Sequence, residues 1–188
     1  MKITIQSKHM NEEDIRFLYT LLPHSCQRLP IHVAVIDDIH VAKEFLQNSS
    51  PAFWERVKQG HTVASYNFAT NRIAIFAENI LHDKYFFIRI AFSFFHEWRH
   101  AFQYHWLSEI FRYEWQRYMH DTSIAAYEEQ WIEQDANHFA YQLLTINAKS
   151  VSSYIGFSDW NCSIQPPAPR HPLLMQEKGR KPKWRLFA

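Results

Sequence analysis

Residues 84–106 read KYFFIRIAFSFFHEWRHAFQYHW and contain neither glycine nor proline. Apolar side chains cover nearly every face of a helix built from this stretch, a pattern typical of a helix that the rest of the domain buries. Its most apolar part, residues 85–95, is too short to span a bilayer and contains Arg89. We therefore expect a buried central helix.

The same stretch contains His96-Glu97-Trp98-Arg99-His100, an HExxH motif. On an α-helix, positions four apart lie about 40° apart around the axis and roughly 6 Å apart along it, so both imidazoles can bind one ion. Glu97 lies about 100° from His96, close enough to reach a water on that ion. Polar side chains in an apolar helix destabilise it unless they are satisfied, which a metal would do. We predict that His96 and His100 are zinc ligands and that Glu97 is the general base.

A catalytic zinc site takes three protein ligands and leaves one position open for water. Residues 123–146 form a second stretch without helix breakers, and we predict Glu133 within it as the third ligand. Asn137 lies one turn later on the same face, where it can hydrogen-bond a ligand histidine. The competing ligand candidates are Glu129, Asp135 and His138.

HExxH on one helix followed by ExxAN-x-FA on the next, here residues 133–140, resembles the ImmA/IrrE family of small zinc metallopeptidases in the gluzincin-like group. The resemblance extends more loosely to residues 66–76. It implies a zincin-like fold, Glu133 as third ligand, a matching role for Asn137, and a hairpin whose sheet edge binds an extended peptide. The chain departs from the family in the 32-residue interval between His100 and Glu133, and it has no recognisable helix-turn-helix domain.

Other segments predict the elements around these two helices. Residues 11–22 predict a helix with Asn11 as its cap, and residues 31–36 predict a strand. Residues 41–57 are helical in pattern but interrupted at Ser49-Ser50-Pro51, and two alternating runs around Thr70-Asn71 predict a hairpin. Residues 108–121 have no clear period. We expect an α+β fold in which a small antiparallel or mixed sheet packs on the active-site helix.

The composition fits one globular domain, since 47% of the 188 residues are hydrophobic and 21% are charged. We assign residues 1–165 to a single metallopeptidase domain and residues 166–188 to a basic, proline-containing tail. Cys26 and Cys162 form no CxxC motif, and the first residues contain no apolar run typical of a signal peptide. These features predict a cytoplasmic protein. No GxGxxG or GxxxxGK motif is present.

The charge is unevenly distributed along the chain. The tail contains six basic residues and one glutamate, a net +5, whereas the total of +1 leaves −4 for residues 1–165. Such a tail can bind nucleic acid or an acidic partner, and it can equally lie on the acidic body of its own chain. We keep both interpretations open.

These observations predict a zinc-dependent metallopeptidase that binds one Zn2+ per chain and hydrolyses a protein or peptide. One alternative is a non-catalytic binding module in which zinc ties two helices together. Another is a metal-free accessory protein of phage or mobile-element origin. The remaining histidines, among them His9 and His82, lie singly in polar or mixed surroundings, and we interpret most of them as surface or hydrogen-bonded residues.

Overall fold

The computed structural model describes residues 1–47, 49–119, 126–127, 129–158 and 160. The predicted tail, residues 166–188, lies outside these ranges. Within the described part, no helix combines the length and the apolar character needed to cross a membrane. The fold is α+β, as predicted, with a small mixed sheet.

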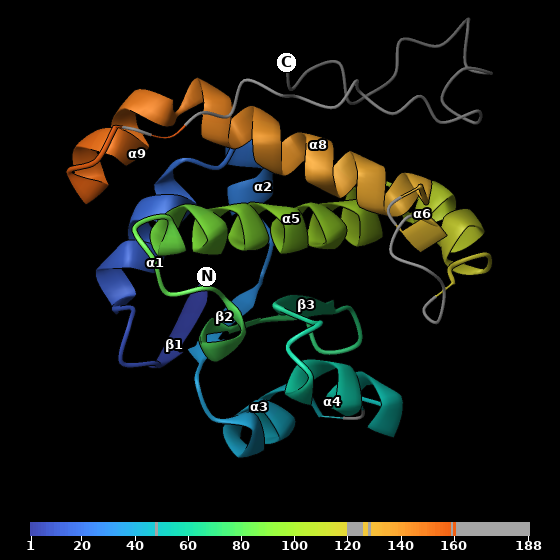
Figure 1. The fold of residues 1–188 in the computed structure, drawn as a ribbon. Helices are drawn as coiled ribbons and strands as arrows, with labels where there is room; N and C mark the ends of the chain where they lie inside the picture. Colours follow the sequence, from blue (N-terminus) through green and yellow to red (C-terminus); the bar gives the residue numbers. More distant parts are fainter. Residues whose placement is uncertain (48, 120–125, 128, 159, 161–188) are drawn as a thin grey trace, which may run out of the picture.

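The elements follow one another in the order strand, helices, strand, helices, hairpin, helices (Figure 1). Their bounds are β1 (Lys2–Gln6), α1 (Glu12–Thr20), α2 (His24–Gln27), β2 (His32–Ile36), α3 (Ile39–Leu46), α4 (Pro51–Lys58), β3 (Ala64–Asn67), β4 (Arg72–Phe76), the 3-10 turn η1 (Ala77–Asn79), α5 (Phe86–Trp106), α6 (Ser108–Trp115), α8 (Trp131–Ile146) and α9 (Ala148–Ile155).

The sheet has the strand order β1-β2-β4-β3, in which β1, β2 and β4 are parallel and β3 runs antiparallel to β4. The predicted hairpin is therefore confirmed as β3 and β4. Asn71 has a φ of 53° at its turn, a conformation that asparagine tolerates better than most residues. The hairpin places β3 at one edge of the sheet.

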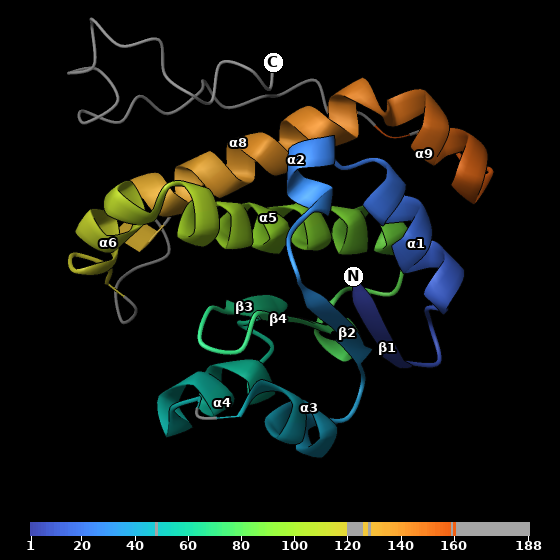
Figure 2. The same cartoon turned by 180° about the vertical axis from the view of Figure 1, so that it is seen from behind.

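Helices cover both faces of the sheet (Figures 1 and 2). Side chains alternate along β2 and β4, so Val33, Val35 and Ile73 join the larger core beneath α1, α5 and α8. Ala34 and Ala74 point to the opposite face, where they join the smaller core formed with α3 and α4. The strands β2 and β4, which are rich in β-branched residues, are therefore buried on both faces, as parallel strands usually are.

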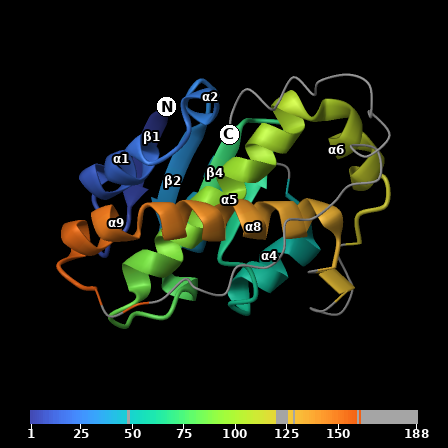
Figure 3. The ribbon, with the colours of Figure 1, turned by 90° about the horizontal axis from the view of Figure 1, so that it is seen from above.

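The predicted buried helix is confirmed as α5, which crosses α8 above the sheet (Figure 3). The second predicted helix is shorter than expected. It begins at Trp131 after an extended Gln130. The Gln130 side chain accepts a hydrogen bond from the backbone N–H of Met119 at 2.8 Å and donates one to the Met119 carbonyl at 3.2 Å. A single helix from residue 123 to 146 was therefore a wrong prediction. Residues 108–115, which showed no clear period, form α6.

Candidate metal centre

The two histidines of the HExxH motif face each other on α5, one helical turn apart. The Nε2 atoms of His96 and His100 are 2.9 Å apart, and the ring centroids are 4.6 Å apart. Both side chains are only 13% exposed. The helical spacing thus brings the two ring nitrogens to one point, as the sequence predicted.

The other nitrogen of each ring is held by a side-chain amide. Nδ1 of His96 lies 3.0 Å from Oδ1 of Asn137, and Nδ1 of His100 lies 2.9 Å from Oε1 of Gln103. Amide oxygens only accept hydrogen bonds, so each Nδ1 carries a proton and each Nε2 presents a lone pair. Two lone pairs that face each other repel unless a cation or a proton lies between them. The same tautomer is the one found in metal-binding histidines whose second nitrogen is held by an acceptor.

Glu133 brings a carboxylate from α8 to the same point. Its Oε2 lies 3.2 Å from Nε2 of His96, its Oε1 lies 3.6 Å from Nε2 of His100, and the residue is 2% exposed. Oε2 is buried and has no hydrogen-bond donor among the residues that the structure describes. In a tetrahedral zinc site with bonds near 2.0–2.1 Å, neighbouring ligand atoms lie about 3.3 Å apart. The three separations of 2.9, 3.2 and 3.6 Å bracket this value, so the side chains fit a zinc ion.

Without a metal, the electrostatics of the cluster favour a bound proton. Burial by itself lowers the pKa of His100, but the charge and hydrogen bond of Glu133, together with Glu97, raise it to about 9. Burial likewise works against ionisation of Glu133, but the two histidines hold its pKa well below the usual range. The site therefore attracts positive charge, which agrees with its fit to a cation.

Glu97, the predicted general base, follows His96 on α5 and is buried, with an exposed fraction of 7%. Burial raises its pKa, while the nearby charges of His100 and His96 and a hydrogen bond from the backbone of Tyr66 oppose this effect. Tyr66 belongs to β3, so Glu97 connects the metal cluster to the edge strand of the sheet. A carboxylate of raised pKa is a better proton acceptor near neutral pH than an ordinary one.

The cluster is supported by contacts that the sequence pattern did not reveal. The hydroxyl of Tyr118 donates to Oε1 of Glu133 at 2.5 Å, and burial raises the pKa of this tyrosine. The amide of Gln103 donates to the Ile132 carbonyl at 2.9 Å and to Oδ2 of Asp135 at 2.8 Å. The position of Gln103, a polar residue one turn after His100, could have indicated its role. No local sequence pattern indicates that Tyr118 contacts Glu133.

The structure also separates Glu133 from the competing ligand candidates. Asp135 forms an ion pair with Arg99 through N–O contacts of 2.7 and 3.1 Å, so its carboxylate is used in packing α5 against α8. Among the described residues, Glu133 is the carboxylate that groups with His96 and His100. One ligand atom from each of the three residues lies within 4.8 Å of the other two. Glu129 and His138 are not members of that group.

A cavity of about 960 Å³ lies along the first half of α5, and neither Glu97 nor any of the three candidate ligands lines it. Phe92, which does line it, is the residue that connects it with the candidate centre, because its ring centroid lies 6.1 Å from that of His96. Val63, directly before β3, lines it as well. The remaining lining residues are Asn79, Ile80, Leu81, Tyr85, Ile88, Arg89, Ser93, Tyr141, Leu144, Ser158 and Trp160.

Comparisons with protein-family models, curated proteins and solved structures gave no match. The grouping of His96, His100 and Glu133 as a candidate centre thus stands on geometry: convergent lone pairs, a buried carboxylate and spacings that fit zinc. Catalysis is a separate question, which depends on Glu97 and on room for a substrate.

Proposed function

We propose that this protein is a zinc metallopeptidase of the ImmA/IrrE-like type, with a zincin-like fold. His96, His100 and Glu133 hold one zinc ion, and Glu97 is the general base. The observation that carries the proposal is the pair of Nε2 atoms 2.9 Å apart, whose Nδ1 atoms are already held by Asn137 and Gln103. This arrangement suits a metal with one position left open, which distinguishes catalytic from structural zinc sites.

A zinc ion in this site supplies Lewis-acid chemistry, lowering the pKa of water and polarising a carbonyl. Glu97 takes the proton from the attacking water and returns it to the leaving amine. Its burial supports this role, because a raised pKa brings a carboxylate closer to the operating pH of a base. Asn137 and Gln103 fix the orientation of the histidine rings, and Tyr118 holds one oxygen of Glu133.

The proposed substrate is a protein or peptide in extended conformation. Among the described residues, the strand β3 pairs on one side with β4 and no strand pairs with its other side, so we propose that an added strand pairs there. Glu97 is joined to this strand through the backbone of Tyr66. The cavity begins at Val63 beside the same strand and can receive one large apolar side chain of the bound peptide.

The substitution Glu97→Gln tests the mechanism, because it preserves size and removes the base. We expect the variant to retain fold and zinc and to lose about 10²–10⁴-fold in the rate of peptide hydrolysis. Glu109→Gln, on the exposed surface of α6, is the matched control and should leave the rate unchanged. The measurements are zinc content by elemental analysis and cleavage of a mixed library of unstructured peptides followed by mass spectrometry.

Full activity in Glu97→Gln would contradict the proposed mechanism. Loss of zinc from this variant would instead make Glu97 a structural residue, and a non-catalytic module tied by zinc would then be the better description. Zinc-free wild-type protein, purified without chelators and unable to take up added zinc, would contradict the metal site itself.

A further inference from the structure

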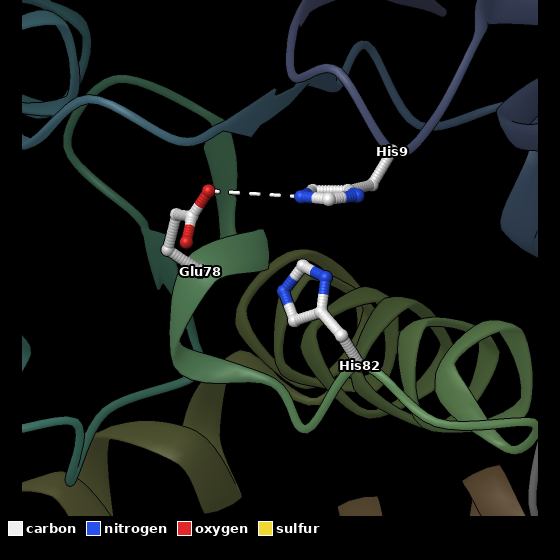
Figure 4. A group of neighbouring side chains, drawn as sticks. All are labelled: His9, Glu78 and His82. Atoms are coloured by element: carbon white, nitrogen blue, oxygen red, sulfur yellow. Dashed lines mark ion pairs between the residues drawn. The ribbon is translucent and has the colours of Figure 1, made fainter.

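Outside the candidate metal centre, two more histidines and a glutamate converge near the start of α5. His9 follows β1, Glu78 lies in η1 directly after β4, and His82 precedes α5. One ligand atom from each lies within 4.8 Å of the other two (Figure 4). The rings of His9 and His82 are 4.0 Å apart at their centroids, and Nε2 of His9 lies 3.6 Å from Oε1 of Glu78.

The sheet topology explains this convergence. The strands β1, β2 and β4 are adjacent and parallel, so the segments that follow their carboxyl ends meet at one edge, where open α/β sheets usually bind ligands. His9 and Glu78 lie in two of these segments. Asp37 directly follows β2, and its Oδ2 accepts a hydrogen bond from the backbone N–H of Lys8 at 2.9 Å, so it adds a carboxylate next to the segment that contains His9. No sequence motif indicated this group, because His9 lies about 70 residues before Glu78 and His82.

His82 is oriented as a metal ligand. Its Nε2 lies 2.9 Å from the carbonyl oxygen of Ala77, which can only accept a hydrogen bond. This nitrogen therefore carries the proton, and Nδ1 keeps the lone pair that binds a cation. A backbone carbonyl on the second ring nitrogen is the usual partner of a metal-binding histidine.

We propose that His9, Glu78 and His82 form a second zinc site, which clamps the β1–α1 connection to the β4–α5 connection. Two imidazoles and a carboxylate suit zinc better than the harder cations Mg2+ or Ca2+, which prefer oxygen ligands. The site is independent of the first centre, because His96 lies ten residues beyond the start of α5 at Phe86, about 15 Å along the helix axis. The chain would then hold two zinc ions when both sites are filled.

Lys8 competes with a cation for Glu78. Its Nζ lies 3.0 Å from Oε1 of Glu78, and its side chain is 69% exposed. An exposed lysine can swing into solvent when a metal arrives, so the ion pair weakens binding without blocking it. The second site should consequently bind zinc less tightly than the buried first centre, and removal of the lysine should strengthen it.

Calorimetric titration of the full chain with ZnSO4, with zinc content measured after dialysis, tests this inference. We expect two binding events in the wild-type protein. His82→Asn and Glu78→Gln should lose the weaker event or bind at least about tenfold more weakly there, while the tight event remains. Lys8→Ala should tighten the weaker event. The control is His61→Asn, an exposed histidine outside the group, which should behave like the wild type.

His100→Ala separates this site from the first one, since it should remove the tight event and leave the weaker event unchanged. All three ligands are exposed, so their variants should keep the wild-type circular dichroism spectrum. A weaker event that survives unchanged in both His82→Asn and Glu78→Gln would overturn the inference. A wild-type protein that takes up no zinc beyond the ion lost in His100→Ala would overturn it as well.

Discussion

Asn137 and Gln103 decide what the two histidines of the motif can bind. Each amide oxygen accepts the Nδ1 proton of one ring, which leaves both Nε2 lone pairs directed at the same point. The amides also restrict rotation of the rings. The geometry with which His96 and His100 would bind a metal therefore depends on two side chains outside the three candidate ligands.

Replacement of Asn137 tests this dependence. We expect Asn137→Ala to weaken zinc binding by about 10–100-fold, because His96 loses the acceptor that sets its tautomer and orientation. Asn137→Asp keeps an oxygen acceptor and should recover most of the affinity. Gln134→Ala, at an exposed position of the same helix, should have no effect. Competition with a chromogenic zinc chelator measures the affinities, and equal affinity in Asn137→Ala and the wild type would show that the amide is dispensable.

In the proposed function, the arrangement of the helices and strands limits where a substrate would lie. The metal cluster projects from α5 and α8, the base is joined to β3, and the cavity lies between the residue preceding β3 and the first half of α5. A peptide paired with β3 would therefore pass the base and place a side chain in the cavity. This geometry predicts a preference for a large apolar residue near the cleaved bond.

Val63→Glu tests the predicted preference, because it places a charge at the mouth of the cavity. Val63 is 38% exposed, so the fold should tolerate the change. We expect kcat/KM to fall about tenfold or more for peptides with a large apolar residue, with zinc content unchanged. Ile146→Glu introduces the same charge at a 69% exposed apolar residue outside the cavity and should leave kcat/KM as in the wild type. An unaltered cleavage preference in Val63→Glu would rule out this cavity as a substrate pocket.

For the molecule as a whole, the candidate centre is also a connection between two crossing helices. His96 and His100 on α5 meet Glu133 on α8, and the same helices are joined by the Arg99–Asp135 ion pair. A zinc ion that binds only the folded chain stabilises it by mass action, by about 2.7 kcal/mol when free zinc is a hundredfold above Kd. Removal of zinc should therefore lower the free energy of unfolding of the whole domain.

We expect a chelator to lower Tm by about 5–10 °C under those conditions. The effect should depend on pH. In the metal-free protein the pKa of His100 is raised to about 9, so its stabilising contribution is complete below about pH 6.5 and is lost as the pH rises through 9. Zinc binding requires neutral imidazoles and strengthens as they deprotonate. The Tm difference between zinc-bound and metal-free protein should hence widen between pH 6.5 and 9.

Differential scanning calorimetry across this pH range measures both forms. His100→Ala is the control, because it removes both the titrating group and a zinc ligand. The Tm of this variant should not change when zinc is removed from the first site, and it should lack the pH dependence caused by His100. A chelator that leaves Tm unchanged in a wild-type protein shown to contain zinc would contradict the connection between metal and fold.

Local patterns in the sequence predicted most of the helices and strands and the paired histidines of the candidate centre, and Glu133 was predicted as their partner from its place in the second helical stretch. The helix of residues 86–106, the hairpin turn at Asn71 and the shared face of His96 and His100 follow from spacing, because a helix or a tight turn sets the geometry of residues only a few positions apart. A hydrogen bond between Asn137 and a ligand histidine was also predicted from its position one turn after Glu133, and the structure shows that this histidine is His96. The first strand, residues 2–6, was not predicted, because its pairing with β2 depends on a segment 30 residues away.

Only the tertiary structure decided which distant side chains meet. The crossing of α5 and α8 brings Glu133 to the histidines and directs Asp135 to Arg99, although both carboxylates lie on one short helix. Tyr118 reaches Glu133 through the path of the chain after α6, and the parallel order of β1, β2 and β4 brings His9, Glu78 and His82 together. These contacts depend on how whole elements pack, and no periodicity within a single segment encodes the angle at which two helices cross or the edge at which three strands end.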